Sequence, residues 1–130
     1  MRAKKTAPET SAELIAIYCA AWSEPDAARR GELLERVWDE GATYTDPSVH
    51  VDGRAALSAH IGGMMQKYPG ATVAPTSVID VHHGWLRFAW QKTLSNGEKL
   101  PEGIDIAELS SEGRLRRIIG FFGKLKPLGQ

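Results

Sequence analysis

The sequence has no excess of charge of either sign. Its 16 basic residues are balanced by 16 acidic residues. A protein that binds a nucleic-acid backbone or an anionic membrane through charge carries a surplus of lysine and arginine. We therefore expect neither a nucleic acid nor a membrane as partner, and the composition favours a small molecule that carries little charge.

Cysteine is almost absent, and long apolar runs are missing. Cys19 is the single cysteine, so no disulfide can form within the chain, which fits a reducing compartment. Met1 to Thr10 lack the apolar segment of a signal peptide, and no stretch has the length of a membrane span. These features predict a cytoplasmic protein in which Cys19 packs as a small side chain on a helix.

The sequence motifs of several chemistries are also missing. There is no glycine loop for phosphate, no Cys-x-x-Cys or His-Glu-x-x-His pattern for a metal, and no nucleophile elbow. His82 and His83 are adjacent on a predicted strand, which directs their side chains to opposite faces and keeps them from sharing a metal ion. The sequence predicts no metal site and no cofactor, and it does not support hydrolysis through a serine or a metal.

The length of 130 residues fits one domain with one core. We expect residues 1–8 to be disordered and residues 9–126 to form this single domain. No internal repeat and no low-complexity segment divides the chain.

Alternating apolar residues dominate the segment from Ser77 to Gly123. Its turn sequences are His83-Gly84, Asn96-Gly97 and Ser111-Glu112-Gly113, and Asn-Gly between alternating segments is a strong hairpin signal. The turns separate four expected strands of an antiparallel meander: Val78–Val81, Trp85–Leu94, Ile104–Leu109 and Leu115–Phe122.

The period-2 alternation assigns residues to the two faces of this sheet. Leu86, Phe88 and Trp90 share one face of their strand. On the following strand Asp105 falls in the row of Gly103, Ala107 and Leu109, where an apolar side chain is expected. The last strand alternates in the same way, with Ile118, Gly120 and Phe122 on one face and Ile119 and Phe121 on the other.

The first half of the sequence predicts three helices. The first spans Glu9 to Trp22, with Thr10 or Ser11 as N-cap and Glu13 placed for a capping box, and it is apolar nearly all round. The second follows Pro25-Asp26, spans Ala27 to Trp38 and ends at Asp39-Glu40-Gly41. The third begins at Gly53 and continues to about Lys67, with His60 within its apolar stripe.

A short strand is expected between the second and third helices. It comprises Ala42 to Thr45 and ends at Asp46-Pro47, because proline cannot donate to a strand ladder and favours an extended predecessor. Helices followed by long antiparallel strands indicate an α+β fold with the helices on one face of a curved sheet. A hollow between the helices and the sheet follows from this arrangement.

Several motifs occur in an order that resembles the NTF2-like superfamily, specifically its SnoaL-like and ketosteroid-isomerase-like domains. They are Tyr18-x-x-Ala21-Trp22, Ala42-Thr43-Tyr44-Thr45-Asp46-Pro47, Gly53-Arg54-x-Ala56-Leu57, Glu102-Gly103-Ile104-Asp105 and Gly113-Arg114-Leu115. The resemblance spans about Glu9 to Gly123. It implies an NTF2-like cone, in which a strongly curved antiparallel sheet carries three N-terminal helices on its concave face.

The same resemblance implies a set of site residues. Ketosteroid isomerase uses a tyrosine on its first helix, an aspartate before a proline and an aspartate on a later strand, and these positions correspond to Tyr18, Asp46 and Asp105. His60 is a fourth catalytic candidate. The expected walls of the ligand pocket are mostly aromatic and aliphatic, namely Trp22, Met64, Phe88, Trp90, Ile118 and Phe122.

Each candidate also has a purely structural interpretation. Asp46 fits a strand end or turn, where aspartate bonds its own backbone. Tyr18 fits a core aromatic and His60 a core histidine. Asp105 fits either a solvent-free pocket, which would raise its pKa, or an ion pair with a buried Arg54 or Arg87, which would lower it.

Two functions remain open at this point. In the first, Asp46 removes a proton next to a carbonyl while Tyr18 and Asp105, or His60 in place of one of them, stabilise the enolate, giving an isomerase or a polyketide-type cyclase without cofactor. In the second, the pocket binds a small apolar molecule without catalysis. In either case we expect a homodimer that forms through the outer face of the sheet, where Ile119 and Phe121 would otherwise be exposed.

Overall fold

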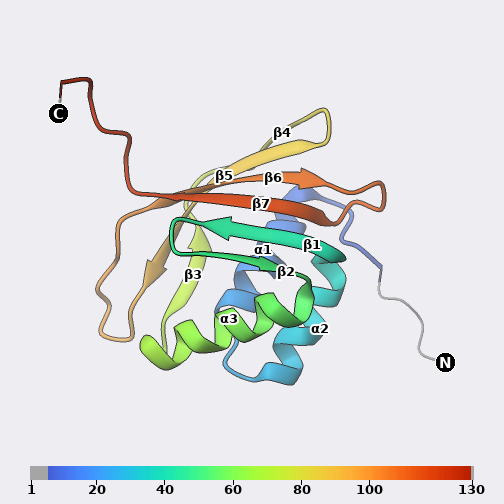
Figure 1. The fold of residues 1–130 in the computed structure, drawn as a ribbon, viewed down its shortest axis with the longest axis horizontal. Helices are drawn as coiled ribbons and strands as arrows, with labels where there is room; N and C mark the ends of the chain where they lie inside the picture. Colours follow the sequence, from blue (N-terminus) through green and yellow to red (C-terminus); the bar gives the residue numbers. More distant parts are fainter. Residues whose placement is uncertain (1–5, 130) are drawn as a thin grey trace.

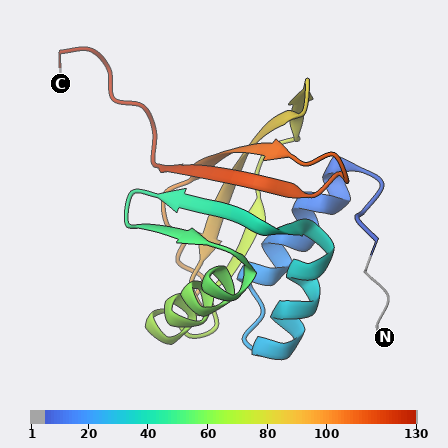
Figure 2. The same ribbon diagram turned by 45° about the vertical axis from the view of Figure 1, so that its right-hand side comes forward.

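The computed structural model describes residues 6–129. Three helices lie on one side of a curved sheet, and the two views in Figures 1 and 2 show this same arrangement. The predicted α+β fold is confirmed. The expectation of disorder in residues 1–8 falls mainly on residues 1–5, which lie outside the described residues.

The helices begin where local capping signals predicted. Helix α1 (Ser11–Trp22) is capped by Thr10, whose Oγ1 accepts a hydrogen bond from the backbone N–H of Glu13 at 3.1 Å. Helix α2 (Ala27–Val37) is capped by Asp26, which accepts from the N–H of Arg29 at 2.9 Å. Helix α3 (Arg54–Lys67) follows Gly53, whose φ of 90° favours glycine. The predicted bounds therefore differ from the observed ones by only one or two residues.

Seven strands form one sheet, in the order β2-β1-β7-β6-β5-β3 with β4 paired to β5. The strand β7 joins β1 in parallel, whereas the other pairs are antiparallel, so the sheet is mixed rather than wholly antiparallel. The strands are β1 (Trp38–Asp46), β2 (Val49–Asp52), β3 (Thr72–Pro75), β4 (Asp80–His82), β5 (Trp85–Thr93), β6 (Gly103–Leu109) and β7 (Leu115–Phe122).

The first strand differs most from its prediction. Asp39-Glu40-Gly41 lies inside β1, although aspartate and glycine are depleted in strands. These residues are tolerated because the pairing of β1 with β7 shifts register between Trp38 and Thr43, and they occupy that irregular stretch. The strand is thus nine residues long, and α2 ends one residue earlier than predicted.

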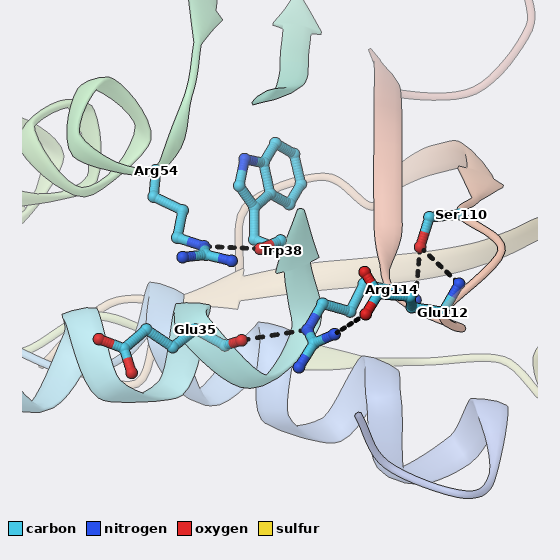
Figure 3. Close-up of polar contacts among 6 residues, drawn as sticks. All are labelled: Glu35, Trp38, Arg54, Ser110, Glu112 and Arg114. Atoms are coloured by element: carbon cyan, nitrogen blue, oxygen red, sulfur yellow. Dashed lines mark hydrogen bonds and ion pairs between the residues drawn. The ribbon is translucent and has the colours of Figure 1, made fainter. Parts of the chain in front are cut away.

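Two arginines fix the junction between α2 and β1 (Figure 3). Arg54 Nε donates to the backbone carbonyl of Trp38 at 2.7 Å, and Arg114 Nε donates to the carbonyl of Glu35 at 3.2 Å. The second contact satisfies a carbonyl of the last turn of α2, where a cation is also favoured by the helix dipole. The start of β1 is therefore held from both the helical layer and the sheet.

The main core lies between the helices and the inner face of the sheet. Tyr18 stacks on Trp38 with 5.9 Å between the ring centroids and an angle of 11° between the rings. The largest fully buried side chains come from all three helices and from β1 and β7, and include Ile15, Leu34, Trp38, Leu57, Ile61, Leu115 and Ile118. None of the described helices is long and apolar enough to cross a membrane.

Candidate functional site

One cavity of about 350 Å³ opens between the helical layer and the sheet. Helices α1 and α3 form one side, and residues of β1, β3, β5, β6 and β7 form the other. The cavity is lined by Tyr18, Cys19, Trp22, Tyr44, Asp46, Ser48, His60, Met64, Lys67, Tyr68, Val73, Phe88, Trp90, Lys92, Asp105 and Phe122. This volume is at the lower end of the range for small-molecule sites.

The cavity brings together the four residues predicted as catalytic: Tyr18, Asp46, His60 and Asp105. Five of the six predicted wall residues line it as well: Trp22, Met64, Phe88, Trp90 and Phe122. The expected position of Ile118 in the wall is wrong. Ile118 is fully buried in the core, where it pairs with Tyr44 on β1 and with Ala107 on β6. It precedes Gly120 by two residues on β7 and so lies on the same face of the sheet, but further into the core.

Asp105 is a buried carboxyl group, with 4% of its surface exposed. Its Oδ1 accepts a hydrogen bond from the indole N–H of Trp90 at 2.9 Å. Burial raises the pKa of Asp105 to about 7, the Trp90 hydrogen bond opposes this shift, and the charge of Asp46 adds to it. A substantial neutral fraction at neutral pH makes Asp105 able to donate a hydrogen bond.

Neither arginine considered as a partner reaches Asp105. Arg54 is bound to the carbonyl of Trp38, and Arg87 pairs with Asp80 at 3.0 Å on the solvent side of the sheet. The interpretation of Asp105 as one half of an ion pair with either arginine is therefore excluded. Of the two directions considered for the pKa of Asp105, the surroundings favour the raised one, because burial is the largest influence.

Two glycines make room for the Trp90 and Asp105 side chains. Gly103 on β6 pairs with Trp90, and a Cβ added there would overlap the indole ring and lie 2.9 Å from the carbonyl oxygen of Phe121. Gly120 on β7 pairs with Asp105, and a Cβ there would lie 2.7 Å from Asp105 Oδ1. Both glycines are thus required by close approach rather than by an unusual backbone conformation.

Asp46 lies at the end of β1 in a very different environment. Its Oδ1 accepts from the N–H and the hydroxyl of Ser48, both at 2.7 Å, and from the N–H of Val49 at 3.1 Å. Its Oδ2 accepts from the Tyr44 hydroxyl at 2.6 Å. Partial burial acts to raise the pKa of Asp46, but these hydrogen bonds and the nearby His60 outweigh it and lower the pKa. Asp46 is therefore ionised at neutral pH.

The two carboxyl groups face one another across Gly120. The strand β7 lies between β1 and β6, so the backbones that carry Asp46 and Asp105 are about 10 Å apart. A Cβ at Gly120 would lie 3.7 Å from the Cβ of Asp46 and in contact with Asp105. The missing side chain at Gly120 gives room to the Asp105 carboxyl group, so that no side chain of β7 lies between it and the ionised Asp46.

Tyr18 and Trp22 present two unpartnered donors to this cavity. Tyr18 has 2% of its surface exposed, and neither its hydroxyl nor the Trp22 indole N–H has a hydrogen-bond partner among the described residues. Burial raises the pKa of Tyr18 well above its usual range, the charge of Asp105 adds to the rise, and the Trp22 N–H opposes it without reaching hydrogen-bond geometry. Buried donors without partners are costly, so both suit an acceptor atom of a ligand.

His60 lies near Asp46 and packs against aromatic rings. Its ring centroid is 5.8 Å from that of Trp22 and 6.1 Å from that of Tyr44. Burial lowers the pKa of His60, Asp46 acts in the opposite direction, and Lys92 lowers it further. The imidazole is therefore mainly neutral at neutral pH.

Comparison with known proteins gives the family. No protein-family model matches the chain, and neither does any curated protein. A candidate isomerase of the SnoaL-like family from Agrobacterium tumefaciens shares 31% sequence identity and a TM-score of 0.81, covering 86% of this chain and 96% of that one. The chain belongs to the SnoaL-like family, within the NTF2-like superfamily.

More distant structures share the fold of this SnoaL-like domain. A Catenulispora acidiphila protein with a ketosteroid isomerase-like fold, crystallised with trimethylamine, has 13% identity and a TM-score of 0.68 over 91% of this chain and 88% of its own. The epoxide hydrolase/cyclase-like enzyme SalBIII, which acts in pyran ring formation in salinomycin, has 19% identity and a TM-score of 0.64, with coverage of 85% and 88%. At such identities the likeness concerns the fold alone.

Sequence reasoning missed several lining residues of the SnoaL-like domain, above all Tyr44 and Lys92. Tyr44 is two residues before Asp46 on β1, and Lys92 is two residues after Trp90 on β5. The period-2 rule that was applied to Phe88 and Trp90 places both missed residues on the cavity face. The alternation along each strand is thus the signal that identifies Tyr44 and Lys92, and in the strand predicted at Ala42 to Thr45 it applies to Tyr44 as well as to Asp46.

The structure also corrects the expectation for His82 and His83. Their rings lie in contact, with the two Nδ1 atoms 3.3 Å apart, because His83 has a φ of 49° and turns out of the strand geometry. They lie at the turn after β4, away from the cavity lining. Among residues 6–129, no group of three or more histidine, cysteine or acidic side chains is arranged to hold a metal ion.

Proposed function

We propose that this SnoaL-like domain is a cofactor-independent isomerase or cyclase, which removes a proton next to a carbonyl group and stabilises the resulting enolate. The observation that carries the proposal is the pair of carboxyl groups in one cavity with opposite pKa shifts, lowered at Asp46 and raised at Asp105. Environments that separate two carboxyl pKa values assign one group as base and the other as acid.

In the proposed reaction Asp46 takes the proton. The C–H bond breaks and an O–H bond forms at Asp46, while the electron pair of the C–H bond becomes the carbon–carbon double bond and the π pair of the carbonyl moves onto its oxygen to give the oxyanion. The neutral Asp105 and the unpartnered hydroxyl of Tyr18 donate to that oxyanion. His60, which is neutral and near Asp46, can replace one of these donors or pass the proton on.

The second half of the reaction determines the product class. If Asp46 returns the proton to a different carbon of the enolate, the double bond moves and the enzyme is an isomerase. If the enolate carbon attacks a second carbonyl of the same molecule, a carbon–carbon bond forms as the π bond of that carbonyl breaks, the new alkoxide takes the proton from Asp46, and the enzyme is a cyclase. The aromatic walls at Phe88 and Trp90 suit a planar conjugated intermediate in both cases.

One observation favours the alternative of a binding domain without catalysis. Asp46 already accepts four hydrogen bonds from Tyr44, Ser48 and Val49, as expected for a structural turn residue. Such bonding also lowers its basicity. In this alternative, the same cavity would hold a small apolar molecule, oriented by Asp105 and Tyr18.

Exchange of ketone protons separates the two proposals. The probe is 2-tetralone in D₂O, with deuterium incorporation followed by NMR and binding followed by the fluorescence of Trp22 and Trp90, which line the cavity. We expect the wild-type protein to accelerate exchange and Asp46→Asn to lose about 10²-fold or more of that rate while still binding the ketone. The exposed Asp80→Asn is the matched control and should keep the wild-type rate.

Two results would contradict the enzyme proposal. One is wild-type exchange no faster than in buffer despite saturable binding, which would favour the binding domain. The other is an unchanged rate in Asp46→Asn, which would remove Asp46 as the base.

A further inference from the structure

The cavity opening carries two ammonium groups around one aromatic ring. Lys67 is the last residue of α3, and its Nζ lies 5.4 Å from the centroid of the Tyr68 ring. Lys92 lies on β5, and its Nζ is 5.3 Å from the same centroid. All three side chains line the cavity. Each lysine thus makes a cation–π contact with the same tyrosine ring.

In the described part of the chain, Lys67 and Lys92 have no ion-pair partner. The nearest acidic influence on Lys92 is Asp46, whose two oxygens already accept hydrogen bonds from Tyr44, Ser48 and Val49. The two ammonium groups therefore give the opening a local excess of positive charge, although the overall charge of the chain is balanced.

The position of Lys92 makes this charge part of the cavity rather than of the outer surface. Lys92 is half-buried and continues the row of Phe88 and Trp90 on the cavity face of β5. Burial lowers its pKa, Asp46 opposes the shift, and Lys67 adds to it. A partly desolvated cation without a counter-ion gains more from an anionic ligand than an exposed surface lysine does.

The strand also sets a distance between the two ends of the cavity. Asp105 pairs with Phe88, and Lys92 is four residues further along β5, which corresponds to about 13 Å. The deep end presents the donors of Asp105, Tyr18 and Trp22, while the open end presents the two lysines. Apolar side chains occupy the space between these ends, including Phe88, Met64 and Val73.

We propose that the substrate of the SnoaL-like domain is an oxo-carboxylate, bound with its carboxylate between Lys67 and Lys92 and its carbonyl oxygen at Tyr18 and Asp105. This inference rests on the proposed function and names its substrate class. A carboxylate has two oxygens, so that each ammonium group can donate to one of them in a charge-assisted hydrogen bond. The body of the molecule remains apolar, as the cavity walls require.

The test compares 8-oxo-8-phenyloctanoate, whose extended chain can place its carbonyl and its carboxylate at the two ends of the cavity, with its amide, which has the same shape but no charge. Binding is measured by the quenching of tryptophan fluorescence, because Trp22 and Trp90 line the cavity. We expect the carboxylate to bind the wild-type protein about tenfold more tightly than the amide, as a partly desolvated charge contact provides. Increasing salt should reduce this ratio.

Substitutions at the two lysines should remove the preference. We expect Lys92→Met to weaken carboxylate binding by about tenfold and the more exposed Lys67→Met by less, with amide binding unchanged in both. Lys92→Arg should retain most of the preference. Lys126→Met, in the exposed segment after β7, removes the same charge far from the cavity and should change neither affinity.

The inference is overturned by equal affinities in the wild-type protein, by the absence of saturable quenching with both probes at millimolar concentration, or by a preference that persists in the Lys67→Met, Lys92→Met double variant. These results are separate from those for the proposed function. If ketone exchange depends on Asp46 without any carboxylate preference, only the substrate class is wrong. If the lysines select carboxylates but no proton exchange occurs, the binding domain is favoured and the carboxylate site remains.

Discussion

Replacing Asp105 by asparagine tests the electrostatics of the cavity directly. Asparagine has nearly the same shape, and its Oδ1 can still accept the hydrogen bond that Trp90 donates at 2.9 Å. The substitution therefore removes the ionisation of Asp105 and little else. Since Asp105 is 4% exposed, solvent screens its charge only slightly.

The magnitude follows from the two pKa values. Burial raises the pKa of Asp105 from 3.8 to about 7, so between these values the folded protein keeps a proton that the unfolded chain has released. The contribution to stability is complete below pH 3.8 and is lost as the pH rises through about 7. The full difference corresponds to about 4 kcal/mol, of which about 2–3 kcal/mol falls between pH 5 and pH 8.

The assay is urea unfolding of the wild-type protein and Asp105→Asn at pH 5 and pH 8. We expect the variant to be the more stable protein at pH 8, and its advantage to be about 2–3 kcal/mol larger there than at pH 5. Taking the difference between the proteins cancels other titrating groups such as His60. Asp80→Asn controls for the loss of a carboxylate from the exposed surface.

The reasoning is refuted if Asp105→Asn is less stable than the wild-type protein at pH 8. A carboxyl-carbon NMR titration gives an independent check, with an expected midpoint for Asp105 near 7. A midpoint below 3.8 would mean that Asp105 is stabilised as a carboxylate. It would also remove the neutral donor that the proposed enolate chemistry requires.

Two further predictions concern packing and assembly. Gly103→Ala should lower the free energy of unfolding by about 1–3 kcal/mol, because a Cβ there overlaps the Trp90 ring. The control Gly31→Ala in α2, where a Cβ meets no neighbour, should raise it by about 0.5–1 kcal/mol. Equal effects of the two substitutions in urea unfolding would contradict the packing argument. We also propose a homodimer through the outer face of the sheet, which exposes Trp85, Ile104, Ile106, Ile119 and Phe121. Sedimentation should show a dimer at micromolar concentration and a monomer for Phe121→Glu, and a monomeric wild-type protein would refute the proposal.

The helices and the long strands were predictable because their signals are local. Thr10 and Asp26 mark helix starts through hydrogen bonds to the next turn, and alternation along β5 to β7 assigns each residue to a face. The short strands β2 and β3 were missed, since four-residue edge strands depend on partners far along the chain. The parallel pairing of β1 with β7 has no local signal at all.

The candidate site was predictable to the extent that strand faces and family motifs determine it. Asp105 stood out because a carboxyl group occupied an apolar row, and the cavity indeed contains it. Ile118 shows the limit of this reasoning, since alternation gives the face of a residue but not its position along the cavity. Tyr44 and Lys92 were missed because neither interrupts its pattern, and their roles depend on Asp46 and Tyr68 from other elements.

The central place of β7 in the sheet has a consequence for folding. This strand is formed by residues 115–122, yet it separates β1 from β6 and completes the wall between Asp46 and Asp105. Without β7, the β1–β2 hairpin is not paired to the sheet formed by β3, β4, β5 and β6, because β7 alone lies between β1 and β6. Non-local pairing of this kind slows folding, because a long loop must close before the contact forms. The cavity is therefore complete only when β7 has paired with both β1 and β6, so ligand binding requires the whole sheet to be in place.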